Sequence, residues 1–497
     1  MKAYQDASLA PARRAKALLE EMTLAEKVGQ LNQRLYGFRI YERKCVNGED
    51  TIELSEEFRQ EVEKYSGLGV LYGLYRADPW ADKDYETGLT GVLSKKAYNQ
   101  VQRYVLEHSR LGIPVMMSSE CPHGHQALDG YLLPVNLLAG ATFDPAMVRA
   151  AYRVSGRQLQ NMGVDFALMS MLDVLRDPRW GRSEECYSED PYLSARMAEA
   201  AVIGMQESGP KVVAKHFAAQ GEGTGGVNAS AARIGERELR EIHFPPAAAA
   251  IKAGAKGIMA AYNEIDGVYC HANRWLLNDV IRKEMGFDGI VMSDGVAIDQ
   301  LDSMTGDNVV SGALALQSGV DVGLWDEAFG KLEEAVRRGL VKEAQIDQAV
   351  LRVLTLKFER GLFEHPYLEE EGEIHMDYAQ NPESVQLARE GLVILQNKNQ
   401  VLPFWENQAS GKKIAVVGPN ADDLYNQLGD YTPPLRRDDG ITVLDGMKLI
   451  FKESDIRFSQ GCYLRKRDEN LLKEAVDTVK NSDIVICGLG GSSSRFG

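Results

Sequence analysis

Long hydrophobic runs are missing from this sequence of 497 residues. No apolar stretch approaches the about 20 residues that a membrane-spanning helix needs, and residues 1–20 carry charges throughout, without the apolar core of a signal peptide. Positive charge is also in the minority, because the chain has 56 Lys and Arg and 72 Asp and Glu. Its net charge is therefore -16. This balance argues against polyanionic partners, so we expect a cytoplasmic protein that binds neither nucleic acid nor a membrane.

Cysteine is rare and scattered along the chain. The six cysteines are Cys45, Cys121, Cys186, Cys270, Cys462 and Cys487. No two of them form a C-x-x-C pair, so neither a zinc site nor a disulfide framework is indicated. We expect free thiols in a reducing compartment.

Phosphate-binding and dinucleotide-binding loops are not indicated either. Residues 221–226 are rich in glycine but include Glu222 and lack a Lys-Ser/Thr ending, so we interpret them as a flexible loop. Residues 418–420 lack the second and third glycines of a dinucleotide fingerprint. The short loop that carries Glu120, His123 and His125 cannot easily converge three metal ligands. These segments therefore give no signature of a phosphate, a dinucleotide or a metal site.

The length predicts two domains, because one core rarely serves so many residues. Within residues 1–365, short β-branched runs alternate with longer amphipathic stretches, which is typical of βα units around a parallel sheet. The expected strands are 68–72, 113–117, 164–168, 212–214, 257–260, 289–292 and 320–324, with helices such as 145–162, 236–253 and 328–338. The pattern favours an α/β fold, a (β/α)8 barrel of the TIM type.

The rest of the chain predicts a second, smaller domain. Residues 366–383 are acidic and without pattern, which indicates a solvated linker. Residues 384–497 then open a second α/β unit with apolar runs at 413–418 and 483–488. Because the sequence stops soon after the second run, we expect this α/β sandwich to be incomplete at its C-terminal end.

Asp294 is the most informative residue, because an apolar strand ends on it. In a (β/α)8 barrel the active site lies at the C-terminal ends of the strands, although an aspartate there can also simply cap the next helix. Other expected strands are followed by similar groups: Glu120; Asp173 and Arg182; Lys215 and His216; Tyr262 and Asn263. Taken singly, Lys215 and His216 fit a structural ion pair and Arg182 a surface bridge. Together, such groups suit a sugar, whose hydroxyls both donate and accept hydrogen bonds.

Four motifs in order resemble the β-glycosidases of glycoside hydrolase family 3. They are residues 16–31, residues 177–182 with 189–192, Lys215-His216-Phe217, and residues 286–294. Asn397, Leu402-Pro403 and residues 415–420 resemble the opening of the family's second, α/β sandwich domain. The resemblance covers nearly the whole chain.

The resemblance implies an exo-acting retaining β-glycosidase that needs no cofactor. Such an enzyme hydrolyses terminal non-reducing β-D-xylosyl or β-D-glucosyl residues of oligosaccharides, with Asp294 as nucleophile and a second carboxyl group only ~5 Å away. The residues implied to hold the terminal sugar are Glu120, Arg182, Lys215, His216, Met259 and Tyr262, with Asp173 and Asn263 as weaker candidates. Lys215 and Arg182 would keep Asp294 ionised.

Glu120 departs from many glucosidases of the family, which have Asp at this position. A glutamate at this position resembles the xylosidase and arabinosidase branch of the family. Its extra methylene would push the carboxylate toward the space that the hydroxymethyl group of a hexose occupies. A pentose fits slightly better, although one methylene discriminates by only ~1–3 kcal/mol. Glucose stays open.

The general acid/base is the second departure. The histidine pattern that one branch carries after Lys-His-Phe is absent here, so the acid would be a glutamate of the second domain beyond a strand like 484–488. Glu453, Glu469 and Glu474 do not lie in a matching context. The alternatives are a catalytically impaired chain that binds sugar, or an acid supplied by a longer protein or a neighbouring subunit. A homo-oligomer is one way to cover an exposed sheet edge.

Overall fold

The computed structural model describes residues 2–370 and 382–491. It divides into two compact units at Gly391, and the short segment Tyr431–Pro433 belongs to the first unit. The sequence placed this boundary at 383/384, but helix α14 (Glu383–Gly391) packs on α5 and α6 and so goes with the first unit. Part of the predicted linker, 371–381, lies outside the described residues. Within the described ranges, no helix is both long and apolar enough to span a membrane.

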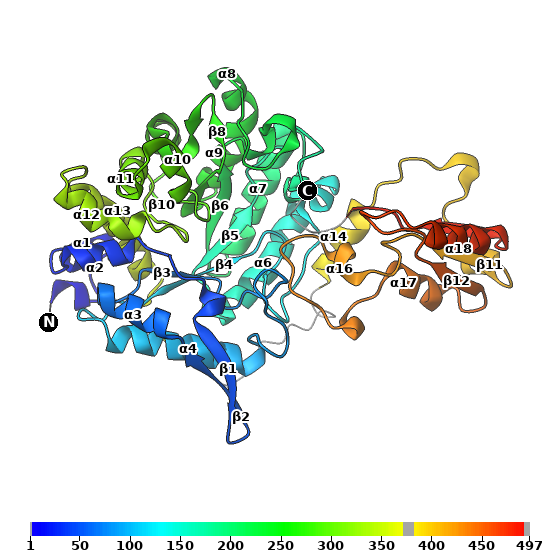
Figure 1. Ribbon diagram of the computed structural model, residues 1–497, viewed down its shortest axis with the longest axis horizontal. Helices are drawn as coiled ribbons and strands as arrows, with labels where there is room; N and C mark the ends of the chain where they lie inside the picture. The colour runs from blue at the N-terminus through cyan, green and yellow to red at the C-terminus, as the bar shows by residue number, and fades with distance from the viewer. Residues whose placement is uncertain (1, 371–381, 492–497) are drawn as a thin grey trace. The chain divides into compact units, whose positions relative to one another are not determined.

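A six-stranded parallel sheet forms the centre of the first unit (Figure 1). In spatial order its strands are β10 (Ile290–Met292), β7 (Gly257–Ala260), β6 (Lys211–Phe217), β5 (Phe166–Ser170), β4 (Met116–Glu120) and β3 (Val70–Tyr72). Every strand residue except Lys211 is buried. Burial on both faces explains the continuous apolar runs of the sequence, because helices cover a parallel sheet.

Two extended segments lie between the two ends of this sheet. Met292 of β10 forms a parallel bridge with Val322. The backbone N–H groups of Gly323 and Trp325 then donate to carbonyls of the segment 31–33, at 3.0 and 2.9 Å. The same segment accepts a bond from the first residue of β3 at 3.5 Å. Hydrogen bonds therefore run from β10 back to β3 through two segments that are not regular strands.

The prediction of a regular strand at 320–324 is wrong, and the cause is local. The backbone N–H of Leu324 donates to the hydroxyl of Ser293 at 2.7 Å instead of to a neighbouring strand. Trp325 has a φ of 64°, a left-handed conformation that ends an extended run. The chain turns here to build a loop.

Helices surround the sheet (Figure 1). They are α1 (Pro11–Leu19), α2 (Leu24–Gln30), α3 (Glu56–Tyr65), α4 (Gly91–Glu107), α5 (Asn136–Ala141), α6 (Pro145–Asn161), α7 (Pro191–Gln206), α8 (Glu236–Glu238), α9 (Phe244–Lys252), α10 (Asp302–Thr305), α11 (Asn308–Ser318), α12 (Leu332–Arg337) and α13 (Glu343–Glu359). Two of the longest begin at Asp-Pro pairs: the carboxylates of Asp144 and Asp190 accept backbone N–H groups of the first turn. Aspartate as N-cap followed by proline is a strong helix start.

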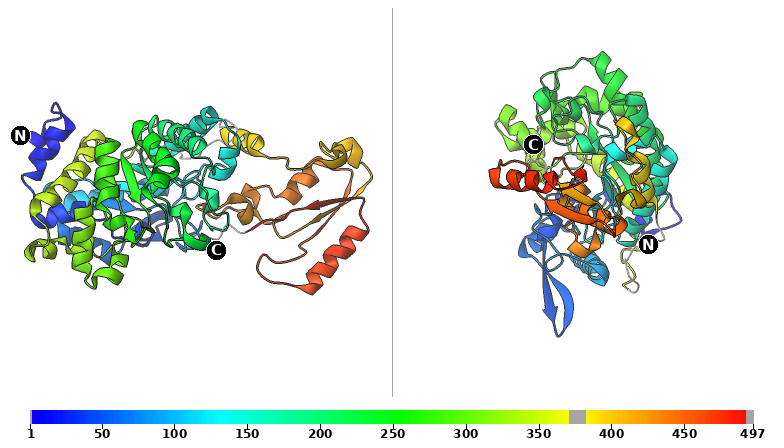
Figure 2. Two further views of the ribbon diagram at one scale, coloured as in Figure 1. Left: turned by 90° about the horizontal axis from the view of Figure 1, so that it is seen from above. Right: turned by 90° about the vertical axis from the view of Figure 1, so that its right-hand side faces the viewer.

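Two hairpins extend the first unit. One is β1 (Tyr41–Val46) with β2 (Glu49–Leu54), which projects from the unit in Figures 1 and 2. The other is β8 (Glu264–Ile265) with β9 (Val268–Tyr269). Their turns are Asn47-Gly48 and Asp266-Gly267, and all four residues have positive φ. This is the turn chemistry that two-residue hairpins require.

The second unit is built on a three-stranded parallel sheet. Its strand order is β12 (Asp455–Ser459), β11 (Lys413–Val417), β13 (Ile484–Cys487), and its helices are α15 (Glu406–Ala409), α16 (Leu424–Leu428), α17 (Val443–Ile450) and α18 (Glu469–Lys480). Central β11 carries the buried core residues Ile414 and Val416, whereas β13 alternates half-buried and exposed residues. The incompleteness of this domain stays a prediction.

The contact between α6 and α7 is tight enough to test by mutation. A Cβ added to Gly204 of α7 would lie 2.2 Å from the carbonyl oxygen of Arg149 in α6. We expect Gly204→Ala to force these helices apart and to lower the free energy of unfolding by about 1–3 kcal/mol. Gly446→Ala in α17 is the control, because its added Cβ would meet nothing closer than 4.0 Å. Urea unfolding curves for both variants check this, and equal stabilities would contradict the packing.

Candidate active site

The residues singled out from the sequence lie at one edge of the sheet. Glu120 ends β4, Lys215 and His216 lie near the end of β6, and Asp294 follows β10 by two residues. Arg182 lies in the loop after β5. All five side chains are buried. Burying charged groups is unfavourable unless they are paired, so their contacts define the site.

Lys215 forms an ion pair with Glu120. Its Nζ lies 2.6 Å from Glu120 Oε2, and Glu120 Oε1 accepts a hydrogen bond from Tyr72 Oη at 3.0 Å. Burial alone would lower the pKa of Lys215, but Glu120, Tyr431 and Glu185 outweigh it and the pKa is raised. Lys215 therefore carries its charge inside the site.

Arg182 is held by Glu185, a residue that the sequence analysis did not single out. Arg182 Nε and Nη2 donate to the two Glu185 oxygens at 2.5 and 2.9 Å, and Ser170 Oγ donates to Glu185 Oε2 at 2.5 Å. Burial alone would raise the pKa of Glu185, but Arg182 and Lys215 outweigh it and the pKa is lowered. Such a two-pronged pair fixes the guanidinium plane. The only sequence signal for this pair was that Glu185 follows Arg182 by three residues.

The hydrogen bonds of His216 determine its tautomer. Arg182 Nη2 lies 2.9 Å from His216 Nε2, and a guanidinium can only donate, so Nε2 is the acceptor. The proton then lies on Nδ1, which donates to Asp173 Oδ2 at 2.7 Å. Burial raises the pKa of Asp173 to about 7. Asp173, a weaker candidate from the sequence, thus orients His216.

Asp294 has one bound and one free carboxylate oxygen. Oδ1 accepts the backbone N–H of Gly295 at 2.8 Å, while Oδ2 is buried and has no hydrogen-bond partner within the described residues. Oδ2 lies 3.6 Å from His216 Nε2. Burial raises the pKa of Asp294, while the positive charges of Arg182 and Lys215 act to lower it. A free carboxylate oxygen near two cations can attack an electrophile.

The backbone around Asp294 is fixed by His271 and Asp326, which sequence reasoning missed. The N–H of Asp294 donates to His271 Nε2 at 3.1 Å. Burial lowers the pKa of His271 to about 3, so the ring stays neutral and able to accept. Asp326 accepts the Ser293 hydroxyl at 2.5 Å and the backbone N–H of Ile298 at 2.8 Å. Asp326 follows the expected strand 320–324 by two residues, as Asp294 follows 289–292, so a strand-end signal was present but was not used, whereas His271 directly follows no expected strand.

A tyrosine far along the chain completes the polar contacts. Tyr431 Oη accepts from Arg182 Nη2 at 3.0 Å and from Lys215 Nζ at 3.4 Å. The Lys215 ammonium also lies 4.6 Å from the centre of the Tyr431 ring. Both cations therefore point at one hydroxyl oxygen. No strand-end pattern marks Tyr431, so sequence reasoning missed it.

The other predicted site residues make contacts that mainly stabilise the fold around the site. Tyr262 Oη donates to the carbonyl of Gly295 at 2.9 Å, beside the nucleophile candidate. Met259 is fully buried in β7, in register with Met292 of β10. Asn263 donates to the carbonyl of Ala218 at 3.3 Å, which stabilises a loop. The roles of all predicted site residues in binding and catalysis stay predictions.

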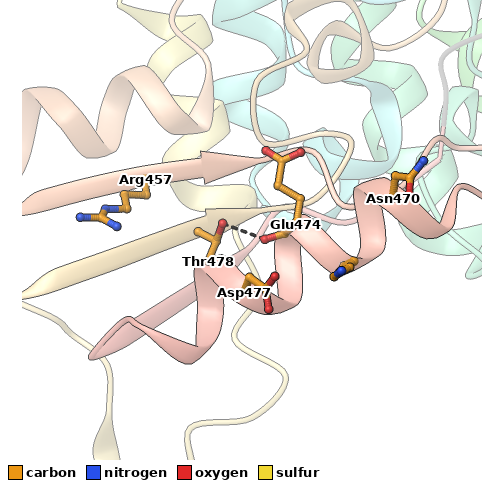
Figure 3. A pocket seen from close by; sticks show the side chains of 6 residues that line it. Arg457, Asn470, Glu474, Asp477 and Thr478 are labelled. Carbon is orange, nitrogen blue, oxygen red and sulfur yellow. Dashed lines mark hydrogen bonds between the residues drawn. The ribbon is translucent and has the colours of Figure 1, made fainter.

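The second unit has a surface hollow of a different character (Figure 3). It lies between α18 and β12 and is lined by Arg457, Asn470, Lys473, Glu474, Asp477 and Thr478. Thr478 Oγ1 donates to the carbonyl of Glu474 at 2.9 Å, a bond within the helix. Glu474 and Asp477 are exposed, unlike the acids of the candidate active site. This hollow gives no candidate for the general acid.

A buried, cation-flanked carboxylate at the C-terminal edge of a parallel α/β sheet points to the glycoside hydrolases as a class. The comparison with family models gives the particular family. Residues 23–356 match the glycosyl hydrolase family 3 N-terminal domain, and residues 392–495 match the family 3 C-terminal domain. The chain belongs to glycosyl hydrolase family 3, which confirms the resemblance found in the sequence.

Similar proteins carry two kinds of name. A β-xylosidase of Formosa agariphila is 31% identical over 466 residues, which cover 85% of this chain and 62% of that protein. A periplasmic β-glucosidase of Salmonella typhimurium is 30% identical over 517 residues, which cover 96% and 62%. This chain therefore spans less than two thirds of the length of these relatives.

Solved structures agree with the fold. A β-glucosidase from Erythrobacter marinus superposes with a TM-score of 0.86 at 31% identity, covering 99% of this chain and 67% of that one. A β-glucosidase from Listeria innocua in complex with glucose gives a TM-score of 0.83 at 28% identity, covering 98% and 65%. The whole described architecture therefore recurs in solved β-glucosidases.

The neutral His271 gives a pH dependence of stability. A histidine whose folded pKa is about 3 binds no proton at pH 5, whereas the unfolded chain does below about pH 6.5, so stability falls as pH drops. Between pH 7 and pH 5 we expect His271 to lower the free energy of unfolding by about 2 kcal/mol. His271→Gln keeps an acceptor for Asp294 N–H and should remove this share of the loss.

The measurement is the free energy of unfolding of both proteins at pH 7 and pH 5. The exposed His108 is the control, and His108→Gln should follow the parent protein. An unchanged pH dependence in His271→Gln would contradict a buried, neutral ring.

Proposed function

We propose that this chain is an exo-acting retaining β-glycosidase. Its substrates are oligosaccharides or glycosides that end in a non-reducing β-D-xylosyl or β-D-glucosyl residue. The observation that carries this proposal is the free, buried Oδ2 of Asp294 beside Arg182 and Lys215. The names of the relatives, β-xylosidase and β-glucosidase, support the same reaction.

Asp294 Oδ2 attacks the anomeric carbon in the first step. The new bond forms as the glycosidic C–O bond breaks, and its electron pair leaves with the aglycone oxygen, which takes up a proton. Water then attacks the glycosyl-enzyme, releases the sugar and restores the carboxylate. None of the residues that the structure describes is assigned as the proton donor, which we still expect to be a glutamate of the second domain.

Glu120, Lys215 and Arg182 bind the terminal sugar in this proposal. Lys215 Nζ and Arg182 Nη2 both donate to one oxygen, that of Tyr431, so they are aimed at a point where a hydroxyl group binds. Glu120, which pairs with Lys215, accepts hydroxyl protons of the sugar. The longer reach of Glu120, compared with Asp, favours a pentose such as xylose.

The fold of the proposed enzyme is a (β/α)8 barrel followed by an α/β sandwich. The segments 31–33 and 320–325 would be the two barrel positions that complete the six strands. The oligomeric state and the cytoplasmic location stay predictions from the sequence.

A second candidate is a chain that binds sugar without cleaving it. It is motivated by the missing assignment of a general acid within the described residues. Such a protein would bind xylose or glucose but would not turn over glycosides with poor leaving groups. Calorimetry that shows no affinity for either sugar would exclude it.

The test of the nucleophile is covalent labelling. We expect activated 2-deoxy-2-fluoro β-xylosyl and β-glucosyl reagents to add one sugar to the protein, because a good leaving group needs little help from an acid. Intact mass and peptide mapping should place the label on Asp294. Asp294→Asn should abolish it, whereas Asp288→Asn, at an exposed acid before the other end of β10, should label normally. A label elsewhere, or none in folded protein, would contradict the proposal.

The pH profile of labelling tests the cations. Asp294 must be ionised to attack, so the rate is present above its pKa and is lost as pH falls through it. Lys215 lowers this pKa, so Lys215→Met should move the acid limb of the profile to higher pH. Lys211→Met, at the other end of β6, should leave the limb in place. An acid limb that does not move in Lys215→Met would contradict the assigned electrostatics.

A further inference from the structure

A row of buried polar side chains ends at Glu120. Its members are Tyr72, Arg76 and Asp78, which we call the Glu120 support. Their exposed fractions are 0, 3 and 6%, although each carries a polar or charged group. Such groups are costly to bury unless they are paired, so their hydrogen bonds show what the Glu120 support holds in place.

The register of the sheet places Tyr72 beside Glu120. Tyr72 is the last residue of β3 and is the partner of Ser118 where β3 and β4 pair in parallel. Residues two apart in a strand project on the same face. Glu120, the last residue of β4, therefore projects on the face of Ser118 and Tyr72. The strand ends thus bring the Tyr72 hydroxyl to the Glu120 carboxylate.

Arg76 fixes the direction of the hydrogen bonds. Its Nη1 lies 2.5 Å from Tyr72 Oη, and a guanidinium can only donate, so the phenol oxygen is the acceptor there. The proton of Tyr72 then goes to Glu120 Oε1 at 3.0 Å. Hydrogen bonds in a row polarise one another, so the bond from Arg76 strengthens the bond from Tyr72 to Glu120.

Arg76 is itself held in place by its neighbours. Its Nε and Nη2 donate to Asp78 Oδ2 at 3.0 and 2.8 Å, and the same oxygen accepts from Gln126 Nε2 at 2.7 Å. Asp78 Oδ1 accepts the backbone N–H of Ala81 at 2.6 Å. The backbone of Arg76 also forms an antiparallel bridge with Ala127. The guanidinium therefore cannot shift without breaking several buried hydrogen bonds.

These contacts leave Glu120 without freedom to move. Its Oε1 accepts from Tyr72, and its Oε2 pairs with Lys215 Nζ at 2.6 Å. A glutamate normally keeps much rotamer freedom, which is lost when both carboxylate oxygens are bound. A Glu120 bound only by Lys215 could still swing about that one contact. The Tyr72 hydroxyl is the second point that prevents this movement.

We propose that Tyr72, supported by Arg76 and Asp78, is a positioning residue that gives the site its preference for a pentose by holding Glu120 in place. This inference rests on the proposed function, in which Glu120 accepts hydroxyl protons of the terminal sugar. A glucosyl unit carries a hydroxymethyl group where a xylosyl unit carries only hydrogen. A site rejects such an extra group only where the neighbouring side chain cannot move aside. The Glu120 support prevents that movement.

The experiment compares the rates at which the activated 2-deoxy-2-fluoro β-xylosyl and β-glucosyl reagents label the protein, followed by intact mass. We expect the xylosyl reagent to label the parent faster. Tyr72→Phe removes only the hydroxyl that holds Glu120 and should raise the relative rate of the glucosyl reagent about tenfold. Arg76→Lys keeps the charge but loses the planar fork, so it should shift this ratio in the same direction. Tyr75→Phe is the matched control, because the hydroxyl of this buried tyrosine donates to the carbonyl of Met162 instead, and its ratio should equal that of the parent.

A Glu120→Asp background separates this role from a purely structural one. The shorter aspartate should not reach the Tyr72 hydroxyl, so we expect Glu120→Asp to raise the relative glucosyl rate and Tyr72→Phe to add nothing further there. An equal shift by Tyr72→Phe in both backgrounds would mean that Tyr72 does not act through Glu120. Equal slowing of both reagents by Tyr72→Phe would show a structural role alone. Either result overturns the inference.

The outcomes separate this inference from the proposed function. A label on Asp294 from either reagent supports the function, independently of the ratio of the two rates. If Asp294 is labelled but the parent does not favour xylose, or Tyr72→Phe leaves the ratio unchanged, the inference is wrong and the function stands. If neither reagent labels folded protein, the proposed function fails and this inference fails with it.

Discussion

Charge compensation in a buried pocket is the constraint on which this structure depends. Arg182 and Lys215 are almost fully buried, and an unpaired charge there would be very costly. Glu185 and Glu120 provide the pairs, and each is held by a hydroxyl donor, Ser170 or Tyr72. Asp294 is a third carboxylate beside two cations. In the proposed reaction, this surplus of negative charge would favour the positive charge that develops on the sugar ring in an oxocarbenium-like transition state. The pairs that allow the cations to be buried thus also leave the site suited to its proposed reaction.

The backbone around Asp294 is fixed by a second set of buried contacts. Asp326 gathers the Ser293 hydroxyl and several backbone N–H groups, and the neutral His271 accepts the N–H of Asp294. These contacts turn the chain at 320–325 away from a regular strand and bring Trp325 over Gly295. A preorganised carboxylate needs no rearrangement at the moment of reaction. The irregular closure of the sheet is therefore linked to the positions of Asp294 and Trp325.

Sequence patterns located the residues whose position depends on strand ends. Four of these residues directly follow apolar strands, so the hydrophobic pattern and the polar residue after it were enough to find them: Asp294, Glu120, Lys215 and His216. Arg182 was found from a sequence motif. Glu185, His271 and Tyr431 reach the site through the tertiary fold, from loops that carry no periodic signal, whereas Asp326 follows the expected strand 320–324 and could have been found by the same criterion. The expected strand at 320–324 failed because side chains of Ser293 and Asp326 capture the backbone N–H of Leu324. Side chains here compete with a neighbouring strand for the same backbone N–H group. This competition arises only in the folded protein, so local sequence propensity cannot predict it.

The most direct test of the account is a crystal structure of the protein after reaction with a 2-deoxy-2-fluoro β-xylosyl fluoride. We expect a covalent bond from the anomeric carbon to Oδ2 of Asp294, with the sugar hydroxyls bound by Lys215 and Arg182 and with Oδ1 still accepting the N–H of Gly295. A sugar attached to another carboxylate, or bound intact with Asp294 unmodified, would contradict it.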